Sequence, residues 1–341
     1  MADFAQHGVI GTLHNLRHRS TEELEAELLR HAPETPMSLV LPCLYSELEG
    51  DALTGIVDKL AKVPYLEEII IGLDAADREQ FERARDFFSK LPQRHSILWN
   101  DGPRLLEIDR RLTTENLSPL ERGKGRNVWY CLGYFLASAR SKVVALHDCD
   151  ILTYERDMPA RLFYPLVHPD MDYVFCKGYY YRAAQGRLNG RVFRLLVTPL
   201  IQALQKTTGN NEYLAYMGSF RYSLSGEFSM RSEVVTSLRI PSDWGLEIGT
   251  LSEVYRNYSP HRICQVDIAD VYDHKHQDLS PEDSKRGLNR MSIDICKALI
   301  RKLAVSGVVF SQETFRTLKA CYYRTALDPV SYTHLTLPTK A

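Results

Sequence analysis

The sequence lacks the features that mark several large classes of protein. No apolar run is close to the length of a membrane-spanning helix, which needs about 18 residues. The N-terminus lacks the pattern of a signal peptide, in which basic residues precede an apolar run. The formal net charge is −1, so no global basic field favours nucleic acid or an anionic membrane. No GxGxxG motif is present, which removes the fingerprint of dinucleotide-binding proteins. We therefore expect no nucleic-acid partner and no membrane partner.

Cysteine provides no disulfide framework. The chain has 7 cysteines, which is an odd number, and no CxxC pair. Cys43, Cys131, Cys149 and Cys176 lie in apolar or motif contexts, which is typical of reduced thiols. We therefore expect a cytoplasmic protein.

The remaining composition is that of an ordinary globular protein, with 44% hydrophobic and 25% charged residues in 341 positions. In the first half, short apolar runs alternate with amphipathic helical segments. We predict strands over residues 38–44, 68–74, 96–100 and 142–146, and helices around residues 56–60, 77–91 and 125–139. This alternation predicts an α/β fold with a mainly parallel sheet and helices on both faces.

The second half is more mixed, but it contains no linker and no internal repeat. We predict strands over residues 172–180 and 263–273 and a strand or hairpin over residues 220–230. We predict helices over residues 192–205, 244–255, 281–305 and 312–326. Before the first strand, Ser20 and Glu23 form a capping box for another helix. We expect a helical extension over residues 1–37 and one composite domain over residues 38–330, with a donor half to residue 150 and an acceptor half from residue 151.

The end of the chain has an unusual sequence. Residues 331–341 resemble an in-frame translation of a transposon-end adapter used to build sequencing libraries. We expect this segment to be a non-native tail that makes few core contacts. The natural chain would then have been cut in or after the helix around residues 314–326, and that helix would expose an apolar face.

The most informative residues are Asp148 and Asp150, which follow the apolar run of residues 143–146. Two carboxylates at the carboxyl end of a buried strand lie where an open α/β sheet binds its ligand. Carboxylate oxygens are hard ligands that suit Mg²⁺ or Mn²⁺ on a phosphate-bearing substrate. An Asp-x-Asp pair alone is also compatible with a solvated acidic loop, so the neighbouring motifs decide between the two readings.

Two further motifs fit a phosphate-bearing ligand. Gly123-Lys124-Gly125 opens a predicted helix, where backbone N–H groups and the lysine charge can meet a phosphate. His274 ends a predicted strand and could complete a metal site with Asp150. Taken alone, the first motif is equally a turn with a solvated lysine, and His274 is equally a core or surface histidine.

Further short motifs stand in a fixed order along the chain. They are Leu41-Pro42-Cys43-Leu44, Gly123-Lys124-Gly125, Asp148-Cys149-Asp150, Asn189-Gly190-Arg191-Val192, Pro199-Leu200, Ser225-Gly226-Glu227-Phe228, Trp244-Gly245-Leu246-Glu247-Ile248-Gly249 and Gln265-Val266, followed by His274. In this order they resemble the motifs of the glucosyl-3-phosphoglycerate synthase family, which are retaining glycosyltransferases of the GT-A fold. The chain departs from the family at Tyr45-Ser46, where a donor-binding Glu is expected, and at Phe193, which replaces the Thr of the acceptor loop.

The resemblance implies transfer of a glucosyl group, with retention, from UDP-glucose or GDP-glucose to 3-phosphoglycerate or a similar small anion. It implies Mg²⁺ or Mn²⁺ as the cofactor and a compatible solute as the product. The implied metal ligands are Asp150 and His274, and the implied catalytic residues are Glu247 and Asp150. The implied donor-binding residues are Pro42, Cys43, Leu44, Asp74, Lys124 and Asp148. Gly190 and Arg191 would hold the acceptor, because an arginine fork fits a carboxylate or a phosphate.

Other interpretations remain open from the sequence alone. Asp148-Cys149-Asp150 also resembles the first motif of haloacid-dehalogenase-type phosphohydrolases, in which the first Asp is the nucleophile. Against this, that motif belongs on the first strand of its fold and prefers Thr or Val where Leu152 stands. Glu247 could equally be a carboxylate on a helix surface. A related glycosyltransferase with a different sugar or acceptor, an inactive relative and a homodimer are also left open.

Overall fold

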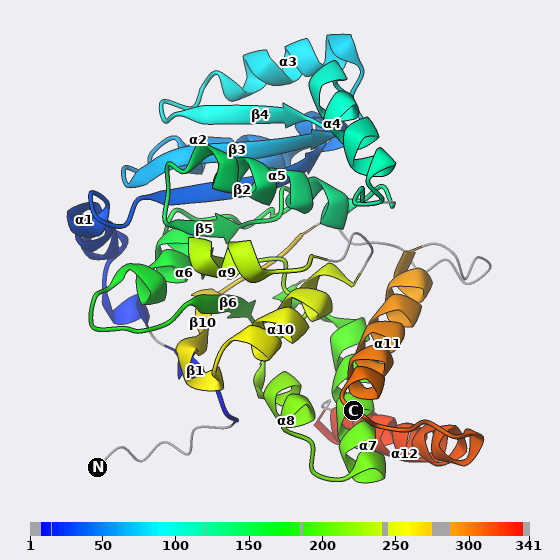
Figure 1. Cartoon of the computed structure of the whole chain (residues 1–341). Helices are drawn as coiled ribbons and strands as arrows, with labels where there is room; N and C mark the ends of the chain where they lie inside the picture. The colour runs from blue at the N-terminus through cyan, green and yellow to red at the C-terminus, as the bar shows by residue number, and fades with distance from the viewer. Residues whose placement is uncertain are drawn as a thin grey trace.

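The computed structural model is built on one eight-stranded sheet with the strand order β1-β10-β6-β9-β5-β2-β3-β4 (Figure 1). The structure describes residues 8–14, 16–119, 121–184, 187–240, 245–274 and 287–336. The strands are β1 Gly11–Leu13, β2 Met37–Leu44, β3 Leu66–Asp74, β4 His95–Trp99, β5 Val143–Leu146, β6 Phe175–Tyr180, β9 Phe228–Arg231 and β10 Ile263–Ala269. A separate two-stranded ribbon pairs β7 Ala183–Ala184 with β8 Arg187–Leu188.

The sheet is mainly parallel, as the alternating pattern predicted. The pairs β2·β3, β2·β5, β3·β4, β6·β10 and β1·β10 are parallel. Only β9 runs the other way among these described strands, pairing antiparallel with β5 and β6. The apolar runs are continuous because both faces of the sheet are covered: in β2, Leu39 and Leu41 enter one core and Val40 enters the other.

Helices cover both faces of this sheet. They are α1 Thr21–His31, α2 Asp51–Leu60, α3 Arg78–Phe88, α4 Pro103–Thr114, α5 Lys124–Ser138, α6 Asp157–Val167, α7 Thr198–Thr208, α8 Glu212–Ser219, α9 Ser232–Ser237, α10 Leu246–Asn257, α11 Gly287–Val305 and α12 Gln312–Thr336. Helices α1, α2 and α6 contribute to one core, and α5, α7, α8, α9 and α10 contribute to the other (Figure 1). In the described part of the chain, no helix is long and apolar enough to cross a membrane.

The predicted elements of the first half are confirmed, including the Ser20 capping box, and the structure shows a second one at α3. The Ser20 and Glu23 side chains cap α1 reciprocally, and Asp77 and Gln80 do the same for α3. Such local signals are reliable because capping depends on residues three apart in the sequence.

Several elements differ from the sequence prediction. Helices α4, α8 and α9 were not predicted. Residues 1–37 were expected to be only helical, but Gly11–Leu13 adds a parallel edge strand beside β10, because its three residues are too few to show a period. Helix α6 was not predicted, since Pro165 lies inside it and usually marks a helix end. The strand predicted over residues 220–230 begins only at Phe228. The preceding segment instead bonds to side chains: Lys177 Nζ donates to the carbonyl of Ser225 at 2.6 Å.

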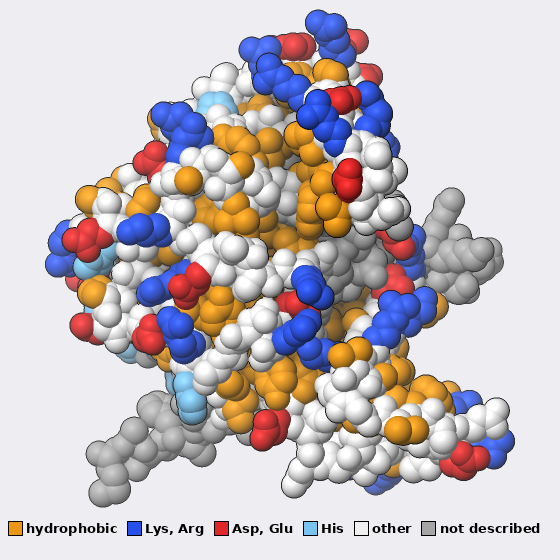
Figure 2. Space-filling view, viewed as in Figure 1, with side chains coloured by type: hydrophobic (Ala, Val, Ile, Leu, Met, Phe, Trp, Pro, Cys, Tyr) orange, Lys and Arg blue, Asp and Glu red, His pale blue; other side chains and the backbone are white. Residues whose placement is uncertain are grey.

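Helix α12 continues to Thr336, so the predicted tail boundary at residue 331 is not marked by a helix end. Residues 337–341 lie outside the described part of the chain, and the tail stays a prediction. Hydrophobic side chains lie at the surface around α11 and α12 (Figure 2). On α12 itself, Phe315, Tyr323 and Leu327 are 44%, 59% and 55% exposed, which is the apolar exposure expected for this helix.

Candidate active site

Asp148 and Asp150 lie just beyond the carboxyl end of β5, in the middle of the sheet. The backbone N–H of His147 still donates to the carbonyl of Val40 at 3.1 Å, so the chain leaves the sheet as it reaches Asp148. Gly226 packs directly against the Asp148 carboxylate: a Cβ atom on Gly226 would lie 2.2 Å from Asp148 Oδ2. Only glycine therefore permits this approach.

Lys124, the first residue of α5, connects two carboxylates from distant parts of the chain. Its Nζ atom lies 2.6 Å from Asp148 Oδ1 and donates to Glu247 Oε1 at 3.0 Å. Burial opposes the ammonium charge, but the charges of Asp148 and Glu247 outweigh it and raise the pKa of Lys124. Glu247 lies in the first turn of α10 with its side chain only 13% exposed, which excludes the alternative of a helix-surface carboxylate.

Backbone pairing brings His274 to Asp150. Ile151 and His274 form an antiparallel bridge, and the Leu152 N–H donates to the carbonyl of Asp273 at 2.9 Å. The Nδ1 atom of His274 consequently lies 3.8 Å from Asp150 Oδ2.

The carboxylates outnumber the cations around Asp148. Burial raises the pKa of Asp150 to about 7, and the nearby Asp148 charge adds to this effect. The same two causes raise the pKa of the buried Glu227 to about 7. A divalent cation would relieve this excess of negative charge, so the donor set suits Mg²⁺ or Mn²⁺.

The protein alone supplies an incomplete coordination shell. Among the described residues, no group of three or more His, Cys, Asp and Glu side chains is placed to hold a metal ion. Asp150 and His274 fit as two ligands, and Mg²⁺ commonly takes its others from water and substrate phosphates.

The expected donor-binding residues lie on the same edge of the sheet. Pro42 pairs with Gly72 and Leu44 with Asp74 in the β2·β3 register, so the ends of both strands reach the level of Asp148. Cys43 is buried, whereas Leu44 is 48% exposed. Burial raises the pKa of Asp74, although its Oδ1 accepts the Ala75 N–H at 3.1 Å.

The two expected acceptor residues lie differently. Gly190 has a φ of +75°, a conformation that favours glycine, and it faces the ring of Tyr222. The Arg191 side chain is exposed and forms no ion pair or hydrogen bond within the described part of the chain. The structure therefore brings Gly190, but not the Arg191 charge, toward the other site residues.

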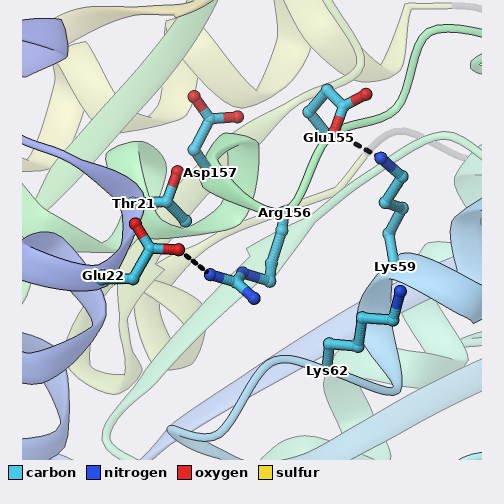
Figure 3. A pocket seen from close by; sticks show the side chains of 7 residues that line it. All are labelled: Thr21, Glu22, Lys59, Lys62, Glu155, Arg156 and Asp157. Carbon is cyan, nitrogen blue, oxygen red and sulfur yellow. Dashed lines mark hydrogen bonds and ion pairs between the residues drawn. The ribbon is translucent and has the colours of Figure 1, made fainter.

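Two cavities lie away from this cluster. One, of about 360 Å³, is lined by Thr21, Glu22, Lys59, Lys62, Glu155, Arg156 and Asp157 (Figure 3). Its charges pair with each other, since Lys59 bonds Glu155 and Arg156 bonds Glu22, both at 2.6 Å. The other, of about 350 Å³, lies between the segment after Asp150 and the end of β10. Neither contains a predicted site residue.

No protein-family model matches the chain. A glucosyl-3-phosphoglycerate synthase of Persephonella marina is 48% identical over 326 residues, which are 96% of this chain and 80% of the relative. One of Methanococcoides burtonii is 42% identical over 275 residues, covering 80% of this chain and 67% of the relative.

The chain belongs to the glucosyl-3-phosphoglycerate synthase family. It is therefore a glycosyltransferase, as the ordered motifs implied. The phosphohydrolase alternative finds no support, because the relatives are glucosyl-3-phosphoglycerate synthases and Asp148 follows the fourth strand of the alternating pattern rather than the first.

Solved structures of this synthase from Mycobacterium tuberculosis share the fold. The complex with Mn²⁺, UDP-glucose and phosphoglyceric acid superposes with a TM-score of 0.63 at 23% identity, covering 89% of each chain. The complex with Mn²⁺, UDP and glucosyl-3-phosphoglycerate gives a TM-score of 0.62 at 22% identity. The fold is therefore GT-A, as expected.

Sequence analysis of this synthase assigned no individual role to three polar residues that line the site, although Glu227 stands in one of the ordered motifs. Glu227 is fully buried and accepts a hydrogen bond from Tyr272 Oη at 2.8 Å. Lys177 is buried in β6, and Arg182 contacts His274. A charged residue inside an apolar strand could have indicated Lys177, whereas Arg182 lies in a loop whose contacts depend on the tertiary fold.

Proposed function

We propose that this synthase transfers a glucosyl group, with retention, from a nucleotide diphosphate glucose to 3-phosphoglycerate or a closely similar anion. The observation that carries the proposal is the convergence of Lys124, Asp148 and Glu247, with Asp150 and His274 beside them, at the carboxyl edge of the sheet. UDP-glucose is the first donor to consider, because UDP-glucose is bound by the related M. tuberculosis enzyme. GDP-glucose is the alternative donor.

Breaking the bond between the anomeric carbon and the diphosphate develops positive charge on the sugar and negative charge on the leaving diphosphate. A cation held by Asp150 and His274 would supply electrostatic stabilisation of that diphosphate. Lys124, paired with Asp148, adds a second positive charge. Glu247, which accepts from Lys124, would accept hydrogen bonds from the sugar or the acceptor. Asp148 would orient the ribose or a water of the cation.

The nucleoside would lie against the ends of β2 and β3. Pro42, Cys43 and Leu44 offer backbone groups and one exposed apolar side chain there, and Asp74 offers a carboxylate. Gly190 would approach the acceptor with its backbone N–H, and Arg191 would add a charge once a ligand reaches the loop. A homodimer, a cytoplasmic location and a role of the product as a compatible solute stay predictions.

A substrate panel tests this proposal. UDP-glucose, GDP-glucose and their mannose counterparts are each combined with 3-phosphoglycerate and glycerate, with Mg²⁺, Mn²⁺ or a chelator, and the product is examined by NMR for anomeric configuration. We expect an α-linked glucosyl phosphoglycerate that requires the cation, and little product from Asp150→Asn. Transfer that proceeds unchanged with the chelator would contradict the metal assignment. If neither UDP-glucose nor GDP-glucose donates a glucosyl group, the proposed function is contradicted.

A further inference from the structure

Arg182 lies between the proposed metal ligand and the acceptor loop. It follows β6, its Nη1 donates to Tyr222 Oη at 2.7 Å, and its Nη2 contacts Nε2 of His274. Gly190 stands on its other side, since a Cβ atom there would lie 3.8 Å from Arg182 Cδ. The Asn189 N–H also donates to the Arg182 carbonyl at 2.7 Å. Arg182 thus contacts His274 of the proposed cation site and lies next to Gly190 of the proposed acceptor site.

The contact with His274 has a consequence for cation binding. A guanidinium can only donate hydrogen bonds, so Nε2 of His274 must accept with its lone pair. The neutral ring then carries its proton on Nδ1, the nitrogen that faces Asp150 at 3.8 Å. An imidazole binds a metal ion through a nitrogen lone pair. While Arg182 keeps this contact, neither ring nitrogen of His274 offers a free lone pair to a cation.

Arg182 also has unused capacity to bind an anion. Its Nε is buried and has no hydrogen-bond partner among the described residues. A buried N–H without a partner is unfavourable, so another orientation of the guanidinium could be more fully bonded. Release of His274 would free Nη2 as well, giving the paired donors that fit a carboxylate or a phosphate. The nearby Gly190 loop is where the acceptor is expected.

We propose that Arg182 couples the two sites. When no cation is present, Arg182 is hydrogen-bonded to His274. When a cation binds to His274, the guanidinium is released and binds the carboxylate or phosphate of the acceptor beside Gly190. This inference rests on the proposed function. Arg182 is then a positioning residue for His274 and a specificity-determining residue for the anionic acceptor.

The test measures binding rather than turnover. Mn²⁺ binding to the full chain is titrated in the presence of UDP by calorimetry and by electron paramagnetic resonance, and 3-phosphoglycerate binding is then titrated into the Mn²⁺–UDP complex. For Arg182→Met we expect Mn²⁺ to bind about threefold tighter or more, because a competing positive charge is removed. We expect 3-phosphoglycerate to bind about tenfold weaker or more, because a charged donor is lost.

The opposite signs separate this coupling from a purely structural role. Damage to the fold would weaken the binding of both Mn²⁺ and 3-phosphoglycerate. Circular dichroism with thermal melting checks that the variant is folded. Arg182→Gln is a second variant with the same expected signs if the methionine variant folds poorly. Arg194→Met is the matched control, because Arg194 is bonded to the Asn189 carbonyl at 3.3 Å in the same loop, and it should leave Mn²⁺ affinity unchanged.

Unchanged or weaker Mn²⁺ binding in Arg182→Met, or unchanged acceptor binding, would overturn the coupling. If the unmodified protein itself binds neither Mn²⁺–UDP nor 3-phosphoglycerate, the proposed function fails instead. The two failures are thus distinguished by the unmodified protein alone.

Discussion

The Nζ atom of Lys124 lies 2.6 Å from Oδ1 of Asp148, so the lysine that begins α5 neutralises the first carboxylate after β5. The second carboxylate, Asp150, has no such lysine at this distance among the described residues and instead faces His274. The two aspartates of one short motif therefore have different neighbours. This difference supports separate roles, with Asp148 oriented toward the nucleotide and Asp150 toward a cation.

Replacing Lys124 with Ala should weaken binding of the donor nucleotide. The substitution removes a charged partner of Asp148 and Glu247, and such a loss typically costs about 1.5–3 kcal/mol, or roughly tenfold in affinity or more. Calorimetry with UDP and, separately, 3-phosphoglycerate measures the effect. We expect the acceptor affinity to change much less.

Arg191→Ala should show the converse pattern, with weaker acceptor binding and nearly unchanged donor binding. The Arg191 side chain is exposed and bonds to no described residue, so its charge is available to an incoming anion at little cost to stability. Measuring KM for both substrates tests the division. An equal loss for donor and acceptor would contradict separate roles for Lys124 and Arg191.

Gly226→Ala should reduce turnover strongly. The new Cβ atom would lie 2.2 Å from the Asp148 carboxylate, so the carboxylate or the turn must move. Gly133→Ala is the matched control. Gly133 lies in α5 with open space around it, and the change should stabilise the helix by about 0.8–1 kcal/mol. Turnover and thermal melting distinguish the two, and an active Gly226→Ala enzyme would refute the close packing.

Acid should destabilise the fold through His147. This side chain is fully buried, and neither ring nitrogen has a hydrogen-bond partner in the part of the chain that the structure describes. Burial lowers its pKa from 6.5 to about 3. Between pH 6.5 and about 3, the unfolded chain therefore binds a proton that the folded chain does not. Stability is complete above pH 6.5 and falls as the pH decreases through this window.

His147→Phe should flatten this acid dependence. The ring packs edge-on to Tyr154 with centroids 5.5 Å apart, and phenylalanine can keep that contact. Urea unfolding at several pH values between 4 and 8 (roughly the measurable range for a reversible transition) compares the two proteins. Parallel pH curves would show that other groups cause the acid sensitivity.

Deleting residues 331–341 should leave the melting temperature and activity unchanged. Leu335 and Leu337 are the only aliphatic side chains in that segment, too few to offset the ordering of its backbone at about 1–2 kcal/mol per residue. Helix α12 does continue to Thr336, so the deletion also removes six helical residues. A deletion that unfolds the protein would show that the segment belongs to the fold.

Local patterns and ordered motifs predicted much of this molecule. The strand before Asp148, the helix after Gly123 and the capping boxes depend on neighbouring residues, so the sequence shows them directly. Other features depend on contacts between distant segments. Arg182 meets His274, and Glu227 meets Tyr272, only because β6, β9 and β10 lie side by side, and no local pattern reports that order.

The antiparallel strand β9 has a further consequence. It stands between β5 of the predicted donor half and β6 of the predicted acceptor half, and it bonds to both. The residues just before β9 contact the neighbours of both strands. Gly226 packs on Asp148, which follows β5, and the Ser225 carbonyl accepts from Lys177, which lies in β6. A hinge between the two halves would have to break this continuous hydrogen-bonded ladder. Shielding of the reacting sugar from water must therefore come from loop movements at the rim of the sheet, not from rotation of one half against the other.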